Sequence, residues 1–199
     1  MNFANEEWED FRERVLGNAY MIWHDGGIDE HAAAKALEKE DPAHVKAMLE
    51  RGLLLEDYVA VEGIKLMQGD EWVKLAEKTL ETSRFRLRIE LAQYLQERFP
   101  ERDYSPYVMD VLGRNPAAFR VDAAVALRNF SAPAVLDRLL ESVRHDPEFL
   151  VRFNAGASYL ILRKIEPVSF YEHEAIFHLI KEDASAEDLA RAADLLKAL

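Results

Sequence analysis

The chain has 199 residues, of which 49% are hydrophobic and 31% are charged, and its formal net charge is −12. This length and apolar content are enough for a sizeable core in one or two domains. The sequence contains no cysteine, which excludes disulfides, cysteine-based zinc sites and thiol catalysis. No stretch approaches the roughly 18 apolar residues of a membrane-spanning helix, and the acidic N-terminus does not resemble a signal peptide. We therefore expect a protein of the reducing cytoplasm that does not enter a membrane.

The negative charge is concentrated toward both ends of the sequence. Residues 1–30 contain eight acids and two bases, and residues 166–199 contain eight acids and three bases. Affinity for nucleic acid depends on Lys and Arg that displace counterions from phosphate, so we expect no nucleic-acid partner. A basic protein would be attracted instead. The alternative is that the excess acid serves only solubility.

Apolar residues recur at steps of three and four along the chain, which is the period of an amphipathic helix. Long alternating runs of Val, Ile and Thr and Asn-Gly hairpin turns are absent from the sequence. The expected fold class is therefore all-α, with about twelve helices. In chain order these helices are predicted near residues 4–23, 28–39, 42–52, 56–68, 70–81, 84–98, 105–114, 116–130, 133–145, 147–164, 169–182 and 185–198.

Several helix starts are marked by a residue that can accept a hydrogen bond from a free N–H group of the first turn. In four cases a proline follows. Proline is tolerated at the first helical position because the N–H that it lacks would have no partner there. These pairs are Asp41-Pro42, Ser105-Pro106, Asn115-Pro116 and Asp146-Pro147. Ser131 and Ser185 are further candidates, and Asp188 follows Ser185 at the spacing of a capping box.

One segment recurs along the chain at a constant spacing of 32 residues. FRVDAAVALRNF (119–130) aligns with VRFNAGASYLIL (151–162), and LRIELAQYL and a weaker YVAVEG precede them at the same spacing. Three copies carry an arginine, at Arg88, Arg120 and Arg152. Two positions later these copies carry an acid or amide, at Glu90, Asp122 and Asn154. Repeats of this period indicate stacked structural units whose apolar faces are covered by the next unit.

These segments resemble the HEAT-repeat family, particularly its short bacterial form, over roughly residues 56–199. The resemblance implies an α-solenoid of stacked antiparallel helix pairs, in which the second helix of each pair lines the concave side. ARAADLLKAL at the C-terminal end looks like a shortened copy. Residues 1–55 fit less well, and we expect them to form a divergent helical cap within the same continuous domain, because terminal repeats are commonly atypical.

The arginine and acid positions of the repeat have a structural interpretation. The arginines could bridge to neighbouring repeats, and the acids could lie early in their helices, where the helix dipole favours negative charge. The functional alternative is that parts of this series face a groove and meet a partner.

Motifs that would support catalysis or metal binding are weak. HEAIFH (173–178) places two histidines five residues apart, whereas the zinc-protease motif needs four so that both share one helix face. HEAT relatives that bind iron use several His-Glu pairs, and His173-Glu174 is the only such pair here. The sequence lacks a recognisable nucleophile motif and a Gly-rich phosphate loop. We therefore expect no enzyme, no catalytic residue, no cofactor and no bound metal.

The leading functional hypothesis is a protein-binding module whose acidic or polar groove accepts a basic protein. One version is a bacterial immunity protein that neutralises a basic toxin, and another is a scaffold or regulatory subunit. A HEAT-like lyase or DNA glycosylase is the enzymatic alternative, although a glycosylase needs a basic concave face. The predicted binding residues occupy exposed positions of the inner helices. They are Glu62, Glu90, Gln93, Glu97, Asp122, Asn129 and Asn154.

Overall fold

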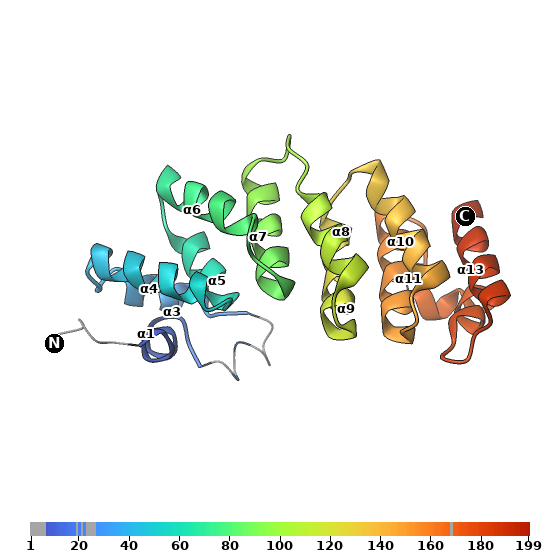
Figure 1. Ribbon diagram of the computed structural model, residues 1–199, viewed down its shortest axis with the longest axis horizontal. Coiled ribbons are helices and arrows are strands. Elements are labelled where there is room, and N and C mark those ends of the chain that lie inside the picture. The colour runs from blue at the N-terminus through green and yellow to red at the C-terminus, as the bar shows by residue number, and fades with distance from the viewer. Residues whose placement is uncertain (1–6, 19, 21, 23–26, 168) are drawn as a thin grey trace. The chain divides into compact units, whose positions relative to one another are not determined.

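The computed structural model describes residues 7–18, 20, 22, 27–167 and 169–199, and every regular element in these residues is helical (Figure 1). The described part of the chain contains twelve α-helices and three short 3-10 helices, without a strand. This arrangement confirms the all-α prediction. The chain forms two compact units, Met1–Leu95 and Gln96–Leu199, which are described in turn. The boundary expected at residue 55 of a continuous solenoid domain stays a prediction.

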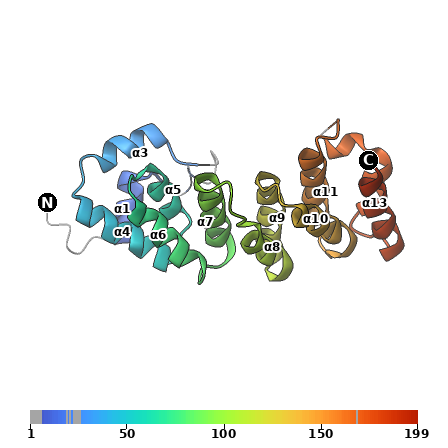
Figure 2. The same ribbon diagram turned by 90° about the horizontal axis from the view of Figure 1, so that it is seen from above.

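The first unit is built around the packing of α1 on two later helices. It contains α1 (Trp8–Val15), α3 (Glu30–Leu37), α4 (Pro42–Leu54), α5 (Val59–Leu66), α6 (Asp70–Leu80) and most of α7 (Phe85–Arg98). The helices α1, α3, α4 and α5 pack against one another, and α3 lies beside α5 when viewed from above (Figure 2). Asp57 in the α4–α5 connection accepts hydrogen bonds from Trp8 Nε1 at 2.8 Å and Arg12 Nη1 at 2.7 Å. These two bonds join α1 to the start of α5.

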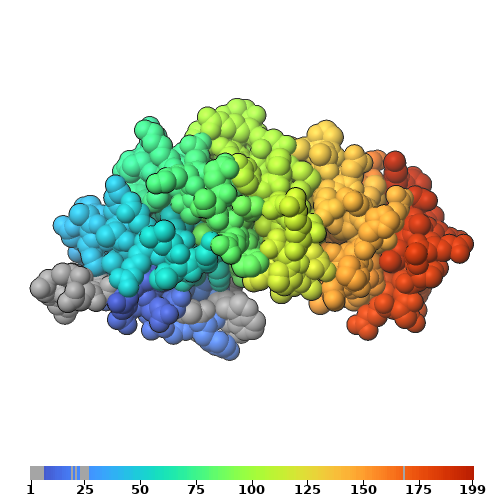
Figure 3. All heavy atoms as spheres, in the orientation of Figure 1, coloured from blue at the N-terminus to red at the C-terminus, as the bar shows by residue number. Residues whose placement is uncertain are grey.

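The second unit consists of helices that pack in consecutive pairs. Its elements are α8 (Ser105–Arg114), α9 (Ala117–Ala126), η1 (Leu127–Asn129), α10 (Pro133–His145), α11 (Phe149–Arg163), η2 (Phe170–Glu172), α12 (Glu174–Phe177), η3 (His178–Ile180) and α13 (Ala186–Ala198). Helix α8 packs on α9 and α10 on α11, while α9 also contacts α11 and α10 also contacts α13. The space-filling view shows this unit, from yellow-green to red, as a continuous surface (Figure 3).

Two of the predicted helices differ from those observed. The helix expected over 4–23 ends at Val15, because Gly17 adopts a φ of 116° that a helix cannot accommodate. Residues 4–6, 19, 21 and 23 of that prediction lie outside the described residues. The helix expected over 169–182 is divided into η2, α12 and η3. It breaks at His173, whose ψ of 59° is not helical and whose Nε2 lies 2.7 Å from the carbonyl oxygen of Pro167.

The helix caps follow the sequence prediction in part. Asp41 accepts hydrogen bonds from the N–H groups of Ala43 and His44, and Ser185 forms the expected capping box with Asp188. The other four predicted caps form no capping bond with their helices. Ser105 is buried at the first position of α8, and its N–H donates to Asp103 instead.

Asn115 likewise does not cap α9. Its amide Nδ2 donates back to the carbonyl of Val111 at the end of α8. Asp146 accepts from the N–H of Glu148, just before α11, and Ser131 has no capping bond to α10.

No helix in the described residues combines the length and the apolar character needed to cross a membrane.

Candidate functional site

Two of the predicted binding residues, Glu62 and Glu90, meet in a small pocket of the first unit. The pocket has a volume of about 250 Å³ and is lined by residues of α3, α5 and α7, of the segment before α3 and of the α4–α5 connection. We call it the charged pocket, because its polar wall consists of Glu30, Tyr58, Glu62, Lys65, Arg86 and Glu90. The volume is sufficient for one extended side chain or a small ligand, and smaller than typical drug-sized sites.

The spacing of residues along two helices explains how these charges come together. Glu62 and Lys65 lie three apart on α5, and Lys65 Nζ is 2.8 Å from Glu62 Oε1. Arg86 and Glu90 lie four apart on α7, with Arg86 Nε 3.5 Å from Glu90 Oε1. Residues three or four apart share one helix face. Lys65 also lies 3.8 Å from Glu90 Oε2, so it connects the carboxylates of the two helices.

Tyr58 supplies an aromatic wall beside these ions. The guanidinium of Arg86 lies over the Tyr58 ring, 3.9 Å from the ring centroid, in a cation–π arrangement. Burial raises the pKa of the Tyr58 hydroxyl, although the neighbouring Arg86 acts in the opposite direction. The phenol is therefore neutral at physiological pH and can donate or accept a hydrogen bond.

Glu90 is held in an environment that disfavours its negative charge. Burial raises the pKa of Glu90 above its ordinary value of 4.5, and the nearby carboxylate of Glu62 acts in the same direction. Lys65 and Arg86 lower the Glu90 pKa, but by less than burial and Glu62 together raise it. An additional cation beside Glu90 would therefore stabilise its charged form.

Glu30 adds a third carboxylate to the charged pocket. It lies in the first turn of α3, is exposed, and forms no hydrogen bond or ion pair with another described residue. The pocket thus contains three carboxylates and two cationic side chains. This imbalance suits a positively charged guest, such as an ammonium or guanidinium group.

The remaining predicted binding residues do not line the charged pocket. Gln93 is half-buried on α7, while Asp122 and Asn154 are half-buried on α9 and α11. Glu97 at the end of α7 and Asn129 in η1 are exposed. Their role in binding a partner stays a prediction.

Sequence reasoning missed four polar side chains of the charged pocket, one of which is Glu30. The other three, Tyr58, Lys65 and Arg86, had a signal in the sequence. Tyr58 occupies the position 32 residues before Glu90, where the other repeats carry an acid or amide. Arg86 precedes Glu90 by four residues, and Lys65 follows Glu62 by three. Helical spacing from the predicted acids would therefore have identified both cationic partners.

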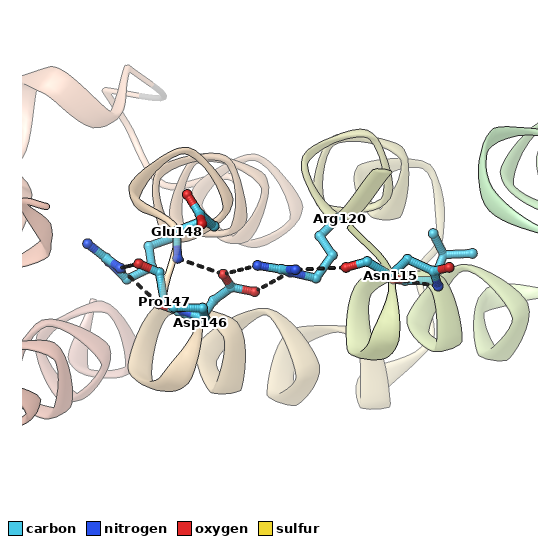
Figure 4. A network of polar contacts seen from close by, with 7 residues as sticks. Asn115, Arg120, Asp146, Pro147 and Glu148 are labelled. Atoms are coloured by element: carbon cyan, nitrogen blue, oxygen red, sulfur yellow. Dashed lines mark hydrogen bonds and ion pairs between the residues drawn. The ribbon is translucent and has the colours of Figure 1, made fainter. Parts of the chain in front are cut away.

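Two of the three arginines of the repeat, Arg120 and Arg152, bridge neighbouring repeats, as the structural interpretation predicts. Arg120 Nε and Nη2 donate to the two carboxylate oxygens of Asp146, both at 2.9 Å, and Nη1 donates to the carbonyl of Asn115 at 2.7 Å (Figure 4). Arg152 is only 2% exposed, and its guanidinium donates to carbonyl groups both before α11 and at the end of η3. These arginines connect successive helix pairs of the second unit.

The acid or amide of the repeat does not lie where it was predicted. Asp122 and Asn154 occupy the second turn of α9 and α11, beyond the first-turn N–H groups that favour negative charge. Asn154 Nδ2 donates to the carbonyl of Leu150 at 2.7 Å within its own helix. The dipole interpretation, which concerned the acids, is therefore wrong for Asp122 and also for Glu90, which lies in the second turn of α7.

Among the described residues, no group of three or more His, Asp or Glu side chains is arranged to hold a metal ion. The first unit also contains a larger cavity of about 520 Å³ between α4 and α6. Its wall includes Leu53, Leu54, Leu75 and Thr79, and so it is less charged than the charged pocket.

None of the family models, curated proteins or solved structures compared with this chain matches the chain.

Proposed function

We propose that the chain is a non-catalytic protein-binding module that captures a basic protein, and that its helix pairs stack as a HEAT-like solenoid. Support for stacking comes from the second unit, where Arg120 and Arg152 connect successive helix pairs through equivalent repeat positions. Stacked repeats present extended surfaces that commonly bind other proteins. The net charge of −12 would steer a basic partner toward the molecule.

The observation that carries the proposal is the meeting of Glu62 and Glu90 in the charged pocket. A lysine or arginine side chain of the partner would enter there and contact carboxylates that its charge stabilises. Tyr58 would contribute its hydroxyl and the edge of its ring. Hydrogen bonds to charged groups contribute about 1.5–3 kcal/mol each, which is enough to make such a side chain a binding hot spot.

The partner defines two versions of this function. A bacterial immunity protein would bind one basic toxin and inhibit its activity. A scaffold or regulatory subunit would bind a basic protein without abolishing its activity. Titrating the captured partner with the chain, while measuring the partner's own activity, separates these versions.

The first test uses small probes of defined chemistry. N-acetyl-arginine amide, N-acetyl-lysine amide and N-acetyl-glutamine amide are titrated into the isotope-labelled full chain, and the NMR signals of residues 58–65 and 86–90 are followed. We expect both cationic amides to shift these signals with saturation, and the glutamine amide to leave them unchanged. Equal shifts with all three amides would contradict a cation site.

Matched variants then connect the pocket with partner capture. Glu62→Gln combined with Glu90→Gln should weaken binding of the cationic amides by about 10-fold, which corresponds to about 1.4 kcal/mol. The control combines Glu38→Gln with Glu187→Gln, which removes the same total charge at exposed sites outside the pocket. If both double variants lose affinity equally, the general negative field of the protein is responsible and the pocket is not the site.

A further inference from the structure

Five aromatic rings gather on the second unit, outside the charged pocket. We call this cluster the aromatic surface, and it consists of Phe149 and Phe153 on α11, Phe170 and Tyr171 on η2, and Phe177 on α12. The Phe153 ring centroid lies 4.9 Å from that of Tyr171, 5.5 Å from Phe170 and 6.1 Å from Phe177. These distances are typical of interacting aromatic pairs.

Packing anchors one side of the cluster and leaves the other accessible. Phe170 is 1% exposed, and its ring lies against Gly156, where even a methyl group would be too close. Tyr171 is 63% exposed, and Phe149, Phe153 and Phe177 are half-buried. Aromatic side chains held in this way form a rigid surface that loses little conformational entropy when a partner binds.

The apolar character continues beyond the rings. Leu150, adjacent to Phe149 on α11, is 58% exposed. Scattered apolar residues are normal on protein surfaces, but contiguous apolar groups mark interaction sites. The ring contacts bring together aromatic residues from two segments of the chain, α11 and residues 170–177.

Carboxylates follow or precede the rings closely in the sequence. Glu148 precedes Phe149 and Glu172 follows Tyr171, while Glu174 begins α12 and Glu182 lies two residues after η3. Residues 166–199 contain eight acids and three bases. Aromatic ring faces attract cations as well, through their quadrupole. A partner for this surface should therefore combine apolar side chains with lysine or arginine.

We propose that the aromatic surface docks an amphipathic basic segment of a partner protein. The apolar side chains of that segment would pack on Tyr171, Phe153 and Phe177. Its cationic side chains would meet the exposed carboxylates that neighbour the ring-bearing residues in the sequence. The proposal rests on the proposed function in one respect, which is that the partner is basic. It concerns a separate surface on the second unit.

The experiment uses two synthetic helical peptides of about 18 residues, long enough for five helical turns. Both carry the same number and spacing of lysines; one has leucine on the opposite face and the other has serine there. Binding to the full chain is measured by fluorescence anisotropy of the labelled peptides. The leucine peptide should bind at least 10-fold more tightly than the serine peptide, because it alone can cover the rings.

Variants then place that binding on the aromatic surface. Tyr171→Ala should weaken binding of the leucine peptide by about 10-fold. Tyr171→Phe should retain most of the affinity, because the aromatic ring is kept. Tyr20→Ala is the matched control, since Tyr20 is also 63% exposed and lies in the first unit. It should change the affinity by less than about 2-fold. Circular dichroism of each variant establishes that the helices are intact.

Different failures have different meanings. Equal binding of the two peptides, or equal loss in Tyr171→Ala and Tyr20→Ala, would overturn the aromatic surface as the docking site. If Glu62→Gln with Glu90→Gln abolishes capture of the basic amides while Tyr171→Ala changes nothing, the proposed function stands and this inference fails. If Tyr171→Ala instead converts a dimer of the chain to a monomer, the aromatic surface binds a second copy of the chain. That result would overturn the proposal that it docks a basic segment of a partner protein.

Discussion

Arg120 and Asp146 form a two-point ion pair between consecutive helix pairs of the second unit. Both hydrogen bonds are 2.9 Å long, and the two side chains are only 15% and 8% exposed. The remaining polar groups around this ion pair also have partners, since Arg120 reaches the carbonyl of Asn115 and Asp146 accepts from the N–H of Glu148. The pair therefore links the start of α9 to the α10–α11 connection.

We expect Arg120→Ala to lower the free energy of unfolding by about 2–3 kcal/mol. The variant leaves the carboxylate of Asp146 nearly buried without its cation, which is costly. Urea denaturation followed by circular dichroism measures the change. Arg138→Ala is the control, because its partner Glu141 is 58% exposed and such pairs contribute about 0–1 kcal/mol. Equal losses in both variants would contradict the structural role of the Arg120–Asp146 pair.

Gly156→Ala should destabilise the second unit by about 1–3 kcal/mol through overpacking. A Cβ atom at this position would lie 2.7 Å from Cζ of Phe170, which is itself buried. Thermal unfolding of the variant is compared with Gly27→Ala, where a Cβ would meet nothing within 4 Å. Adding Phe170→Leu to Gly156→Ala should recover part of the loss, because the two sites share one packing contact. No loss in Gly156→Ala would show that the Phe170 ring moves away freely.

The cap of α13 is expected to contribute about 1 kcal/mol to stability. Ser185 Oγ accepts a hydrogen bond from the N–H of Asp188 at 3.1 Å, and Asp188 accepts in return from Ser185. Ser185→Ala removes this cap and should therefore lower the urea concentration at the midpoint of unfolding. Ser131→Ala, at a position without a capping bond, should change stability by less than about 0.5 kcal/mol. The reverse order of these two effects would contradict the cap assignment.

Glu90 should make stability fall as pH rises above the ordinary carboxyl range. Burial raises the pKa of Glu90 in the folded state above 4.5, so the folded chain holds this proton at pH values where the unfolded chain releases it. The contribution of Glu90 to the free energy of unfolding is therefore fully present below pH 4.5. It is lost as the pH rises through the raised pKa of the folded state. Glu90→Gln, which does not titrate, should flatten the profile in this window and be at least as stable as the wild type at pH 7.

Urea unfolding at a series of pH values from 4 to 8 measures this effect. Asp110→Asn, which replaces an acid of a surface ion pair with Arg114, provides the comparison. A Glu90→Gln profile parallel to that of the wild type would show that Glu90 is not the group responsible. The same linkage predicts that a cation in the charged pocket binds more weakly as pH falls through the Glu90 pKa, because protonation removes its partner charge.

Most helix positions could be predicted because their signals are local. Apolar spacing, the Asp41-Pro42 start and the Ser185–Asp188 capping box act within one turn, and the structure confirms them. The helix predicted over 169–182 failed because distant contacts compete with local preference. The aromatic residues of 169–182 suit a helix, but Phe170 and Phe177 pack on Phe153, and the chain bends at His173.

In the candidate site, too, local spacing predicted some features and contacts between distant residues decided the others. Glu62 and Glu90 were identified from their exposed positions on predicted helices, and Arg86 and Lys65 could have been found from helical spacing. Their meeting in one pocket, and the burial that raises the Glu90 pKa, depend on how α5 and α7 are placed. Asn154 was chosen by the same reasoning, yet its amide bonds to Leu150 in its own helix.

By itself the sequence determined an all-α chain, the approximate helix ends, a 32-residue repeat and an arginine in three of its copies. These features arise from hydrogen bonds and apolar spacing within a few residues. Only the tertiary structure decided that Arg120 pairs with Asp146, that Glu62 and Glu90 share a pocket, and that five rings form one surface. The physical reason is that burial and charge pairing depend on contacts between residues far apart in the chain, which local periodicity does not specify.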